Sequence, residues 1–494
     1  MDSIVNQIKN SSVYDVSKIT ALDHAKKLSG KLDNQIYFKR EDLQPVKSFK
    51  IRGAYNRIAQ LNDQEKKAGV IAASAGNHAQ GVALSAQKLG IEATIVMPTT
   101  TPQIKIDAVR SYGAEVVLFG DSYSDAGEHA KELQKSRDMT YVHPFNDLEV
   151  IAGQGTVGKE IIEQLSDVDY VFVPVGGGGL LAGIASYVKN IKPDCKVIGV
   201  EPIDSDVMTR SIKEGRIAEL ERVGIFADGV AVKVPGNNSF ELCQKYADEM
   251  ITVSTDEICA GIKDIYEDTR AIVEPAGALA MAGATRYIEQ NKIKDKNIVA
   301  INSGANMTFE RLQFIAERTL VGSGKEVLYS IELPEKPGAL RGLVENVVNG
   351  YSISEFNYRK QDVKQAHIFV GMLLNEAEDK SKLEGALKKN NYRFKDLTDN
   401  EISKRHLRHM IGGKAPEGTD ETLFEFVFPE RPGALHEFLT SIADRYNISL
   451  FHYRNNGGDN ARVMIGLEGE NIQINLSDGF SKILVDQSTF ADFI

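Results

Sequence analysis

Lys50 is the side chain whose setting most suggests covalent chemistry. It lies in the segment Ser48-Phe-Lys-Ile-Arg-Gly-Ala54. Ser48 is a suitable N-cap for a helix running to Leu61, which would place Lys50 in the first helical turn. The positive end of the helix dipole disfavours a protonated amine there, so the pKa of Lys50 should be lowered. A free amine can form a Schiff base, although a lysine near a helix start is more often simply solvated.

A second segment, Ser74-Ala-Gly-Asn-His78, could hold part of a small molecule. It lies between a strand predicted over Val70–Ala73 and a helix predicted over His78–Leu89. Backbone amides at a helix N-terminus can bind a carboxylate, and the side chain of Asn77 could donate to a ring oxygen. The same residues would also suit an ordinary turn between a strand and a helix.

A glycine run, Gly176 to Gly179, directly follows a strand predicted over Tyr170–Val175 and opens a helix at Leu180. Four glycines allow close approach of a ligand, and their amides can form an anion cradle. The lysine of a Walker motif is missing, and Leu181 stands where a dinucleotide fingerprint needs its third glycine. The run therefore favours a phosphate site of neither nucleotide type, with tight packing as the alternative explanation.

Ser303, in the segment Asn302-Ser-Gly-Ala-Asn306, adds a hydroxyl after a strand predicted over Asn297–Ile301. A lysine, an amide, a phosphate cradle and a strand-end hydroxyl form a coherent set. Together they suit a phosphorylated aldehyde cofactor that is bound to a lysine.

Alternating strands and helices must position these loops. Further strands are predicted over Ala93–Met97, Glu115–Phe119 and Lys196–Val200, and a helix over Thr101–Tyr112. Strands separated by helices indicate parallel sheets. Ligands bind outside the carboxyl ends of such strands, where the loops above would lie.

The last third of the chain contains an internal repeat. Leu333-Pro-Glu-Lys-Pro-Gly-Ala-Leu340 recurs as Phe428-Pro-Glu-Arg-Pro-Gly-Ala-Leu435, at an offset of 95 residues (429 against 334). Each copy is predicted to contain a strand, a turn, a helix and two further strands, the last being His367–Leu374 or Arg462–Leu467. The sequence thus predicts a duplicated module after the region of alternating strands and helices.

Composition narrows the class of protein. The 494 residues are enough for several domains, and the net charge of −11 argues against a nucleic-acid partner. No apolar run is long enough for a membrane span, and the N-terminus lacks a signal-peptide core, so we expect a cytoplasmic protein without a membrane partner. Cys195, Cys243 and Cys259 are too scattered for disulfides or a metal site and are predicted to be buried.

The motifs together closely resemble the fold type II pyridoxal-phosphate enzymes, and within them the biosynthetic threonine dehydratases (threonine ammonia-lyases). Five segments match in the same order: Lys39–Ala54, Ser74–Gly81, Gly176–Leu180, Val273–Gly277 and Ser303–Asn306. The C-terminal repeat resembles the paired ACT-like modules of the longer, biosynthetic members. The resemblance covers nearly the whole chain.

The resemblance implies an α/β catalytic region like the tryptophan synthase β-subunit, with two parallel-sheet lobes, followed by two α+β ACT-like domains. The expected division is a catalytic domain over 1–320 with a smaller lobe over roughly 42–150, a linker over 321–326, a first ACT-like domain over 327–400, a linker over 401–421 and a second ACT-like domain over 422–494.

The family's site residues carry over to this sequence by position. Lys50 would bind pyridoxal 5'-phosphate as a Schiff base. The cofactor-binding residues would be Lys50, Phe49, Asn77, Gly176, Gly177, Gly178, Gly179, Leu180 and Ser303. The substrate-binding residues would be Ser74, Ala75, Gly76, Asn77 and His78. Glu274 should lie near the cofactor ring, and no metal is expected.

The implied reaction converts L-threonine to 2-oxobutanoate and ammonia, the first committed step of isoleucine biosynthesis. Lys50 would remove the α-proton, and a serine at the pyridine nitrogen would favour elimination over transamination. Serine racemases of this fold carry a serine where Ala75 stands, which argues against racemisation.

Three alternatives remain. The chain could catalyse another reaction of the same fold, such as threonine synthase or diaminopropionate lyase chemistry. It could be a non-catalytic amino-acid sensor, or a degradative threonine/serine dehydratase with different regulation.

Isoleucine is the expected inhibitor at the repeats, with valine as an opposing effector, and the expected assembly is a homotetramer. Candidate allosteric residues are Glu335, Gly338, Ala339, Leu340, Tyr358, Glu430, Gly433, Ala434, Leu435 and Tyr453. His406 and His409 are predicted to lie in a solvated linker rather than a metal site.

Overall fold

A computed structural model places most of the chain. The residues it describes are 3–334, 342–348, 351, 353–360, 365–376, 378–407, 421–429, 438, 441, 448–454, 460–469, 472–476 and 479–485. The chain forms two compact units, Met1–Phe309 and Glu310–Ile494.

The larger lobe of the first unit is built on a six-stranded sheet. Its strand order is β1-β2-β10-β7-β8-β9, and every neighbouring pair is parallel except β1 with β2. The strands are β1 (Leu22–His24), β2 (Gln35–Arg40), β7 (Tyr170–Pro174), β8 (Lys196–Pro202), β9 (Glu249–Val253) and β10 (Asn297–Asn302). β7 and β10 are buried along nearly their whole length, as expected for strands covered on both faces.

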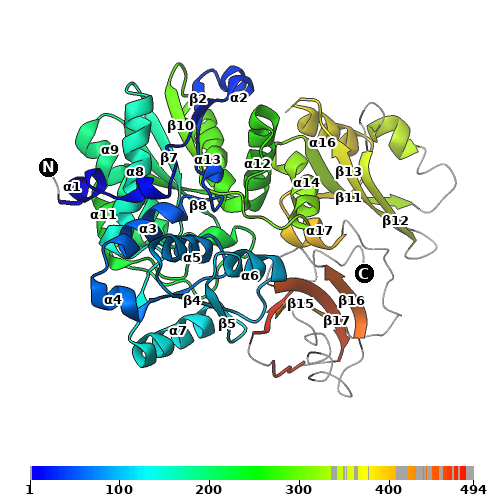
Figure 1. Cartoon of the computed structure of the whole chain (residues 1–494). Coiled ribbons are helices and arrows are strands. Elements are labelled where there is room, and N and C mark those ends of the chain that lie inside the picture. The colour runs from blue at the N-terminus through cyan, green and yellow to red at the C-terminus, as the bar shows by residue number, and fades with distance from the viewer. Residues whose placement is uncertain are drawn as a thin grey trace. The chain divides into compact units, whose positions relative to one another are not determined.

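Helices supply that cover. Figure 1 shows α8 and α9 on one side of the sheet and α12 and α13 on the other. The helices and short helical turns of this lobe are α1 (Ser3–Lys9), η1 (Val13–Asp15), α2 (Lys26–Lys31), η2 (Glu41–Leu43), α8 (Leu148–Gln164), α9 (Gly179–Ile191), α10 (Val207–Glu214), η3 (Asp228–Val230), α11 (Asn237–Tyr246), α12 (Thr255–Thr269) and α13 (Pro275–Asn291).

The smaller lobe is built on a parallel sheet with the order β5-β4-β3-β6. Its elements are α3 (Lys50–Ala59), α4 (Asp63–Ala68), β3 (Val70–Ala73), α5 (Asn77–Leu89), β4 (Ala93–Met97), α6 (Gln103–Arg110), β5 (Glu115–Leu118), α7 (Tyr123–Arg137) and β6 (Thr140–Tyr141). β3 and β4 have the bounds that the sequence predicts, whereas α6 is two residues shorter at each end.

The two faces of this small sheet have separate apolar cores. Val70 and Ala72 pack with residues of α5 such as Val82, whereas Ile71 and Ala73 pack against α7. This alternation follows from the two-residue period of a strand, which turns successive side chains to opposite faces. The lobe is thus a three-layer structure, and its strands end beside the loops predicted to carry chemistry.

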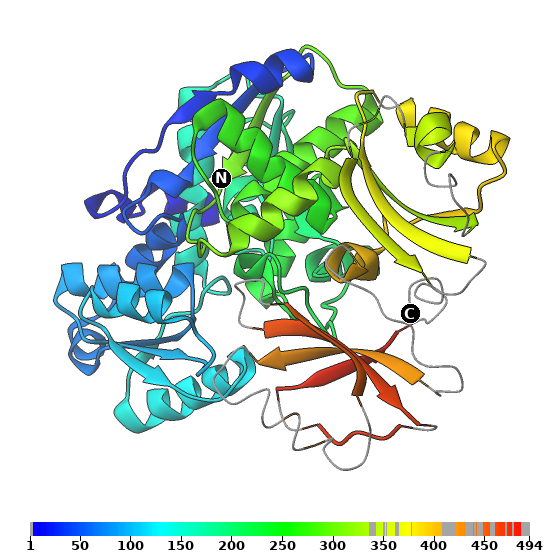
Figure 2. The ribbon, with the colours of Figure 1, turned by 90° about the vertical axis from the view of Figure 1, so that its right-hand side faces the viewer.

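Within its described residues, the second unit contains two four-stranded antiparallel sheets with matching strand orders, β12-β13-β11-β14 and β16-β17-β15-β18. Figure 2 shows the first sheet in yellow and the second in orange and red. β15 begins 95 residues after β11 (421 against 326), so the sequence repeat is also a structural repeat. The elements are α14 (Arg311–Gly322), β11 (Glu326–Pro334), η4 (Val344–Val348), β12 (Ile353–Lys360), β13 (Gln365–Leu373), α16 (Asp379–Lys389), β14 (Phe394–Asp396), α17 (Glu401–Arg405), β15 (Glu421–Pro429), β16 (Ile448–Arg454), β17 (Asn460–Glu468) and β18 (Ser481–Leu484).

The first of these sheets also has two different faces. Val327, Tyr329 and Ile331 of β11 pack against the helical segments that cover one face. Leu328, on the other face, joins an apolar cluster that includes Leu423 of the second sheet. The two repeats therefore share a core within the second unit.

Other features agree with the composition. Cys195, Cys243 and Cys259 are buried and reduced, as predicted. Within the part of the chain that the structure describes, each helix is too short or too polar to cross a lipid bilayer.

Candidate active site

Lys50 is the first residue of α3, in the first helical turn as predicted. Its Nζ atom donates to the carbonyl oxygen of Pro144 over 2.9 Å. Burial lowers the pKa of Lys50 to about 8, and the nearby Glu274 carboxyl opposes this shift. The predicted direction is confirmed, but the dominant cause is loss of hydration rather than the helix dipole.

The prediction that Ser48 caps this helix is wrong. Phe49 stands at the cap position in helical conformation, and no side chain caps the helix start. Ser48 instead forms an isolated antiparallel bridge with Gly304, and Phe49 N–H donates to the Ser303 carbonyl oxygen over 3.2 Å. These contacts bring the Lys50 loop against the loop after β10, so tertiary pairing replaces local capping. The helix also ends at Ala59, before the predicted Leu61.

Asn77, at the start of α5, is held by two side chains. Its Nδ2 atom donates to Glu274 Oε1 over 2.6 Å, and its Oδ1 atom accepts from Asn306 Nδ2 over 2.7 Å. Asn306 Nδ2 also donates to the Val46 carbonyl oxygen over 2.8 Å. The amide of Asn77 therefore has a fixed orientation next to the loop that follows β10.

Glu274 is the acidic group of this site. Its side chain is 4% exposed, and burial raises its pKa to about 7. Asp228 raises the pKa further, whereas the hydrogen bond from Asn77 lowers it. A carboxyl group that titrates near neutrality, beside an amine with a lowered pKa, is typical of acid–base chemistry.

The segment Ser74–His78 lies at the carboxyl end of β3. Ser74 Oγ accepts from Gly76 N–H over 3.3 Å, and Gly76 stands at the cap position of α5 without a side-chain cap. His78 is buried and its Nε2 atom bonds the Val142 carbonyl oxygen over 2.8 Å. Burial lowers the pKa of His78 to about 3, so the ring is neutral at physiological pH. Ala75 packs against the small-lobe core.

The glycine run packs closely against its surroundings. A Cβ atom added to Gly177 would lie 2.3 Å from the ring of Phe145, and one added to Gly179 would lie 2.9 Å from the Phe145 carbonyl oxygen. Gly178 has a φ of +90°, which is strained for other residues, and its added Cβ would meet Met208 at 2.4 Å. Packing therefore requires Gly177, Gly178 and Gly179, which agrees with tight packing as an explanation of the glycine run.

The same run is also suited to an anion. α9 begins at Gly179 with no side-chain cap and no acidic residue in its first turn. The first amides of a helix lack intrahelical acceptors and attract a phosphate group. Leu180, in this first turn, is buried. The loop thus serves packing and leaves a helix start that fits a phosphate.

Ser303 completes the set of donors. It is buried after β10, and its hydroxyl donates to the Ala276 carbonyl oxygen over 3.3 Å. An amine, an amide, a hydroxyl and an uncapped helix start together fit pyridoxal 5'-phosphate. The structure links Lys50, Phe49, Asn77 and Ser303 by direct contacts or through Gly304, and it links the glycine run to them through Pro144 and Phe145.

Most of the predicted regulatory residues lie where the structure gives no description. Glu335, Gly338, Ala339, Leu340, Glu430, Gly433, Ala434 and Leu435 lie outside the described residues. Tyr358 and Tyr453 lie on β12 and β16, but their side chains are not described.

The prediction of a solvated linker is wrong at His406. Its side chain is buried and contacts Glu425 over 3.4 Å, directly after helix α17. His409 lies outside the described residues. Among the residues whose placement is given, no cluster of His, Cys, Asp or Glu is arranged to hold a metal ion.

Sequence reasoning missed the parts of the site that depend on distant contacts. It did not anticipate that Pro144 would accept from Lys50, or that Asn306 would orient Asn77. Asn306 belongs to the segment already singled out for Ser303, so its amide was an available signal. Pro144 carries no such signal, because any residue has a carbonyl oxygen.

Two family models match the chain. The pyridoxal-phosphate dependent enzyme family matches residues 14–304, and the C-terminal regulatory domain of threonine dehydratase matches 317–407 and 412–478. The biosynthetic L-threonine dehydratase IlvA of Burkholderia multivorans is 49% identical over 94% of this chain and 92% of its own length. The corresponding Escherichia coli protein is 46% identical over 93% of this chain and 90% of its own.

A solved structure gives the same result. The processed form of threonine deaminase isoform 2 from Solanum lycopersicum has a TM-score of 0.63 and 52% identity, covering 64% of this chain and 94% of that chain. The fold is thus that of the type II pyridoxal-phosphate enzymes, with regulatory repeats appended. The chain belongs to the pyridoxal-phosphate-dependent enzymes and, within them, to the biosynthetic threonine dehydratase family.

Proposed function

We propose that this chain catalyses the pyridoxal-phosphate-dependent dehydration and deamination of L-threonine to 2-oxobutanoate and ammonia, in isoleucine biosynthesis. The observation that carries the proposal is the placement of Lys50. Its amine has a lowered pKa and lies in one cluster of loops with an oriented amide, a buried hydroxyl and an uncapped helix start.

Each donor suits one part of the cofactor. Lys50 would hold the aldehyde carbon, with Phe49 beside it, and Asn77 would donate to the ring hydroxyl. Gly176 to Gly179 and Leu180 would hold the phosphate with the first amides of α9. Ser303 would donate to the pyridine nitrogen. When bound, the cofactor supplies an electron sink for the carbanion that forms at the α-carbon.

The protein's own groups would bind the substrate and move the proton. The uncapped start of α5, with Ser74, Ala75, Gly76, Asn77 and His78, would hold the carboxylate of threonine. Lys50 Nζ would remove the α-proton, and its lowered pKa supports this role because more of the amine is neutral. Ser303 carries no negative charge, so it would favour elimination rather than transamination.

Three alternatives are less well supported. A sensor without catalysis would have no use for a lysine amine with a lowered pKa in this cluster. Racemisation of serine is disfavoured because Ala75 offers no second base. A degradative role is not favoured either, since the relatives that match more than nine tenths of this chain carry biosynthetic names.

The direct test is formation of 2-oxobutanoate from L-threonine by the purified protein with pyridoxal 5'-phosphate. Turnover with threonine, with slower pyruvate formation from serine and no D-serine, is the expected result. A protein that binds the cofactor but leaves threonine unchanged would contradict the proposal.

We further propose that the repeats over 327–400 and 422–494 are ACT-like regulatory domains. L-Isoleucine would inhibit through them and L-valine would oppose it, in a cytoplasmic homotetramer. The shared apolar core that includes Leu328 and Leu423 supports a coupled response of the two repeats. Inhibition also requires that isoleucine bind two conformational states unequally.

Turnover of the full chain should fall with added isoleucine and recover with valine. Deletion of residues 326–494 should preserve turnover and abolish the response. Isoleucine inhibition that persists after the deletion would contradict this part of the proposal. Sedimentation of the full chain would test the tetramer.

A further inference from the structure

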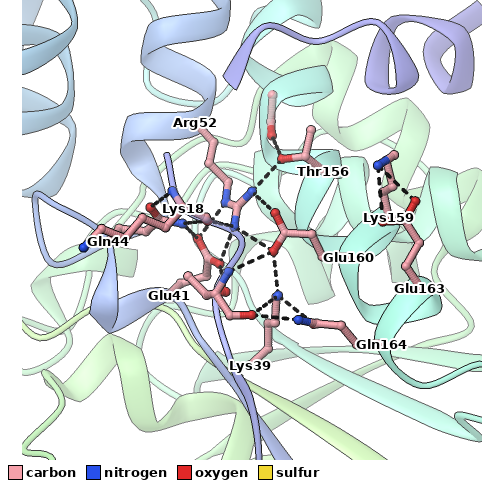
Figure 3. Close-up of polar contacts among 12 residues, drawn as sticks. Lys18, Lys39, Glu41, Gln44, Arg52, Thr156, Lys159, Glu160, Glu163 and Gln164 are labelled. Carbon is pink, nitrogen blue, oxygen red and sulfur yellow. Dashed lines mark hydrogen bonds and ion pairs between the residues drawn. The ribbon is translucent and has the colours of Figure 1, made fainter. Parts of the chain in front are cut away.

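Arg52, two residues after Lys50 in the sequence, belongs to a buried network of charged side chains. The Arg52 side chain is fully buried and lies between the carboxylates of Glu41 and Glu160, whose side chains are also fully buried (Figure 3). Lys39 adds a second cation, 2.6 Å from Glu160. The four formal charges balance, two positive and two negative. The network joins β2, η2, α3 and α8.

The guanidinium of Arg52 uses all its donors. Nε and Nη2 each donate to one oxygen of Glu41 over 2.7 Å. Nη1 and Nη2 donate to the two oxygens of Glu160 over 2.6 and 3.0 Å. Nη1 also donates to Thr156 Oγ1 over 3.0 Å, and Nη2 to the Lys18 carbonyl oxygen over 3.2 Å. A planar group with two paired carboxylates fixes both position and orientation.

The other members of the network are equally well paired. Lys39 Nζ donates to Glu160, to Gln164 Oε1 over 2.9 Å and to the Thr20 carbonyl oxygen over 2.9 Å. Thr20 Oγ1 donates to Glu41 over 2.6 Å. Every charge has partners from more than one segment of the chain, so a shift of α3 would break several bonds at once.

Backbone packing makes α3 depend on this network. The helix start lacks a side-chain cap, so no local capping bond holds its first turn. An added Cβ on Gly153 of α8 would lie 2.6 Å from the Arg52 carbonyl oxygen. One on Gly81 of α5 would lie 3.2 Å from the Lys50 carbonyl carbon. The first turn of α3 is thus enclosed between two helices, and Arg52 ties it to one of them.

We propose that Arg52 is a positioning residue, whose two carboxylate pairs hold the first turn of α3 so that the Lys50 amine has the orientation that the reaction requires. Stability alone is a weak reason for such a network, because apolar residues of similar volume can replace buried ion pairs without loss. Orientation is a stronger reason, since an error of about 1 Å at a reacting group can lower a rate about a hundredfold. The inference rests on the proposed reaction of Lys50.

The test compares Arg52→Lys with the matched control Arg57→Lys. Both arginines lie on α3 and pair with carboxylates of the α8 region, but Arg57 makes a single, partly exposed contact with Asp147. Arg52→Lys keeps the charge and loses the paired geometry. We expect at least a tenfold fall in kcat with KM within twofold, and no such fall in the control. A third variant, Thr156→Val, removes one acceptor while keeping all charges and should lower kcat by about threefold.

A second readout does not need turnover. In the cofactor-free protein, the pH dependence of Lys50 acetylation can be followed by mass spectrometry. The midpoint should lie near pH 8 in the unchanged protein and rise in Arg52→Lys, because the Lys50 amine would become more hydrated. Thr156→Val should also raise the acetylation midpoint, by less than Arg52→Lys. It provides the test if Arg52→Lys fails to fold.

The outcomes are distinct. The positioning role would be overturned if Arg52→Lys folds and has a kcat like that of Arg57→Lys. It would also be overturned if the Lys50 acetylation midpoint moves in neither Arg52→Lys nor Thr156→Val. A rise in KM with unchanged kcat would also overturn it. Absence of threonine turnover in the unchanged protein would instead contradict the proposed function, while the acetylation midpoints would still test the positioning of Lys50.

Discussion

Asn77 and Glu274, which lie 197 residues apart in the sequence, are joined by a 2.6 Å hydrogen bond from the Asn77 amide to the Glu274 carboxyl. The bond connects the small lobe, where Asn77 opens α5, to the start of α13 in the large lobe. It brings a group of variable charge next to the amide proposed to contact the cofactor. The protonation of Glu274 can therefore affect both the stability and the chemistry of the site.

The pKa of Glu274 predicts a pH dependence of stability. Its value of about 7 is above the ordinary 4.5, so the folded protein binds this proton more tightly than the unfolded chain. The contribution is fully present below pH 4.5 and is lost as the pH rises through 7. Glu274→Gln, which cannot ionise, should gain up to about 3 kcal/mol of unfolding free energy relative to wild type between pH 5 and pH 8.

Urea titrations at several pH values would measure this difference. The matched control is Glu241→Gln, at an exposed position of α11. Parallel profiles of wild type and Glu274→Gln would show that the Glu274 carboxyl is not shifted by burial.

Removal of the Lys50 amine should abolish the reaction. Lys50→Ala is expected to lower kcat by about a thousandfold or more, because it removes the proposed base and the covalent attachment of the cofactor. The control is Lys47→Gln, which changes an exposed lysine of the same loop and should retain activity. Turnover and the visible absorption of the bound cofactor would be compared in both proteins. Normal turnover in Lys50→Ala would refute its assignment.

The glycine run should be intolerant of a methyl group. Gly177→Ala would place a Cβ atom 2.3 Å from the Phe145 ring, which should cost about 1–3 kcal/mol of stability and weaken cofactor binding. Gly127→Ala, in helix α7 with open space around its Cβ position, should instead stabilise by up to about 1 kcal/mol. Thermal unfolding and cofactor titration would measure both effects, and equal behaviour of the two variants would contradict the packing described for the loop.

Glu425 should make the second unit sensitive to acid. Its side chain is buried, and bonds from His406 and Arg462, with the charge of Arg405, lower its pKa to about 2 despite burial. The resulting stability is present above pH 4.5 and is lost as the pH falls through 2. Glu425→Gln should therefore destabilise the unit by about 3 kcal/mol at pH 7, with a difference that shrinks below pH 4.

Hydrogen exchange of β15 and β17 would follow this loss locally. Glu376→Gln, at an exposed position before α16, is the control and should leave the exchange unchanged. Equal protection of Glu425→Gln and wild type at pH 7 would exclude a stabilising role.

Local patterns predicted the bounds of two strands of the small lobe correctly. β3 and β4 were delimited correctly because each is an apolar run that ends at turn-forming residues, Gly76 and Asn77 after β3 and Pro98 after β4. The cap of α3 was mispredicted because the pairing of Ser48 with Gly304 depends on a distant part of the chain. The Arg52 network was missed for the same reason, since Arg52 and Glu160 are 108 residues apart. Local sequence patterns do not predict which buried charged residues will form ion pairs with distant parts of the chain.

The uncapped starts of α5 and α9 have a consequence for how fast the protein is degraded in a cell. Ligands that bind only the folded chain add RT ln(1 + [L]/Kd) to its stability, about 2.7 kcal/mol at a hundredfold excess over Kd. A cofactor phosphate bound at α9 would stabilise the folded chain in this way. Newly made chains would therefore unfold transiently more often while the cofactor is scarce. Where cleavage is slow relative to reclosing, proteases sample the open population. The amount of this enzyme would then follow the supply of vitamin B6 through degradation, without any change in its synthesis.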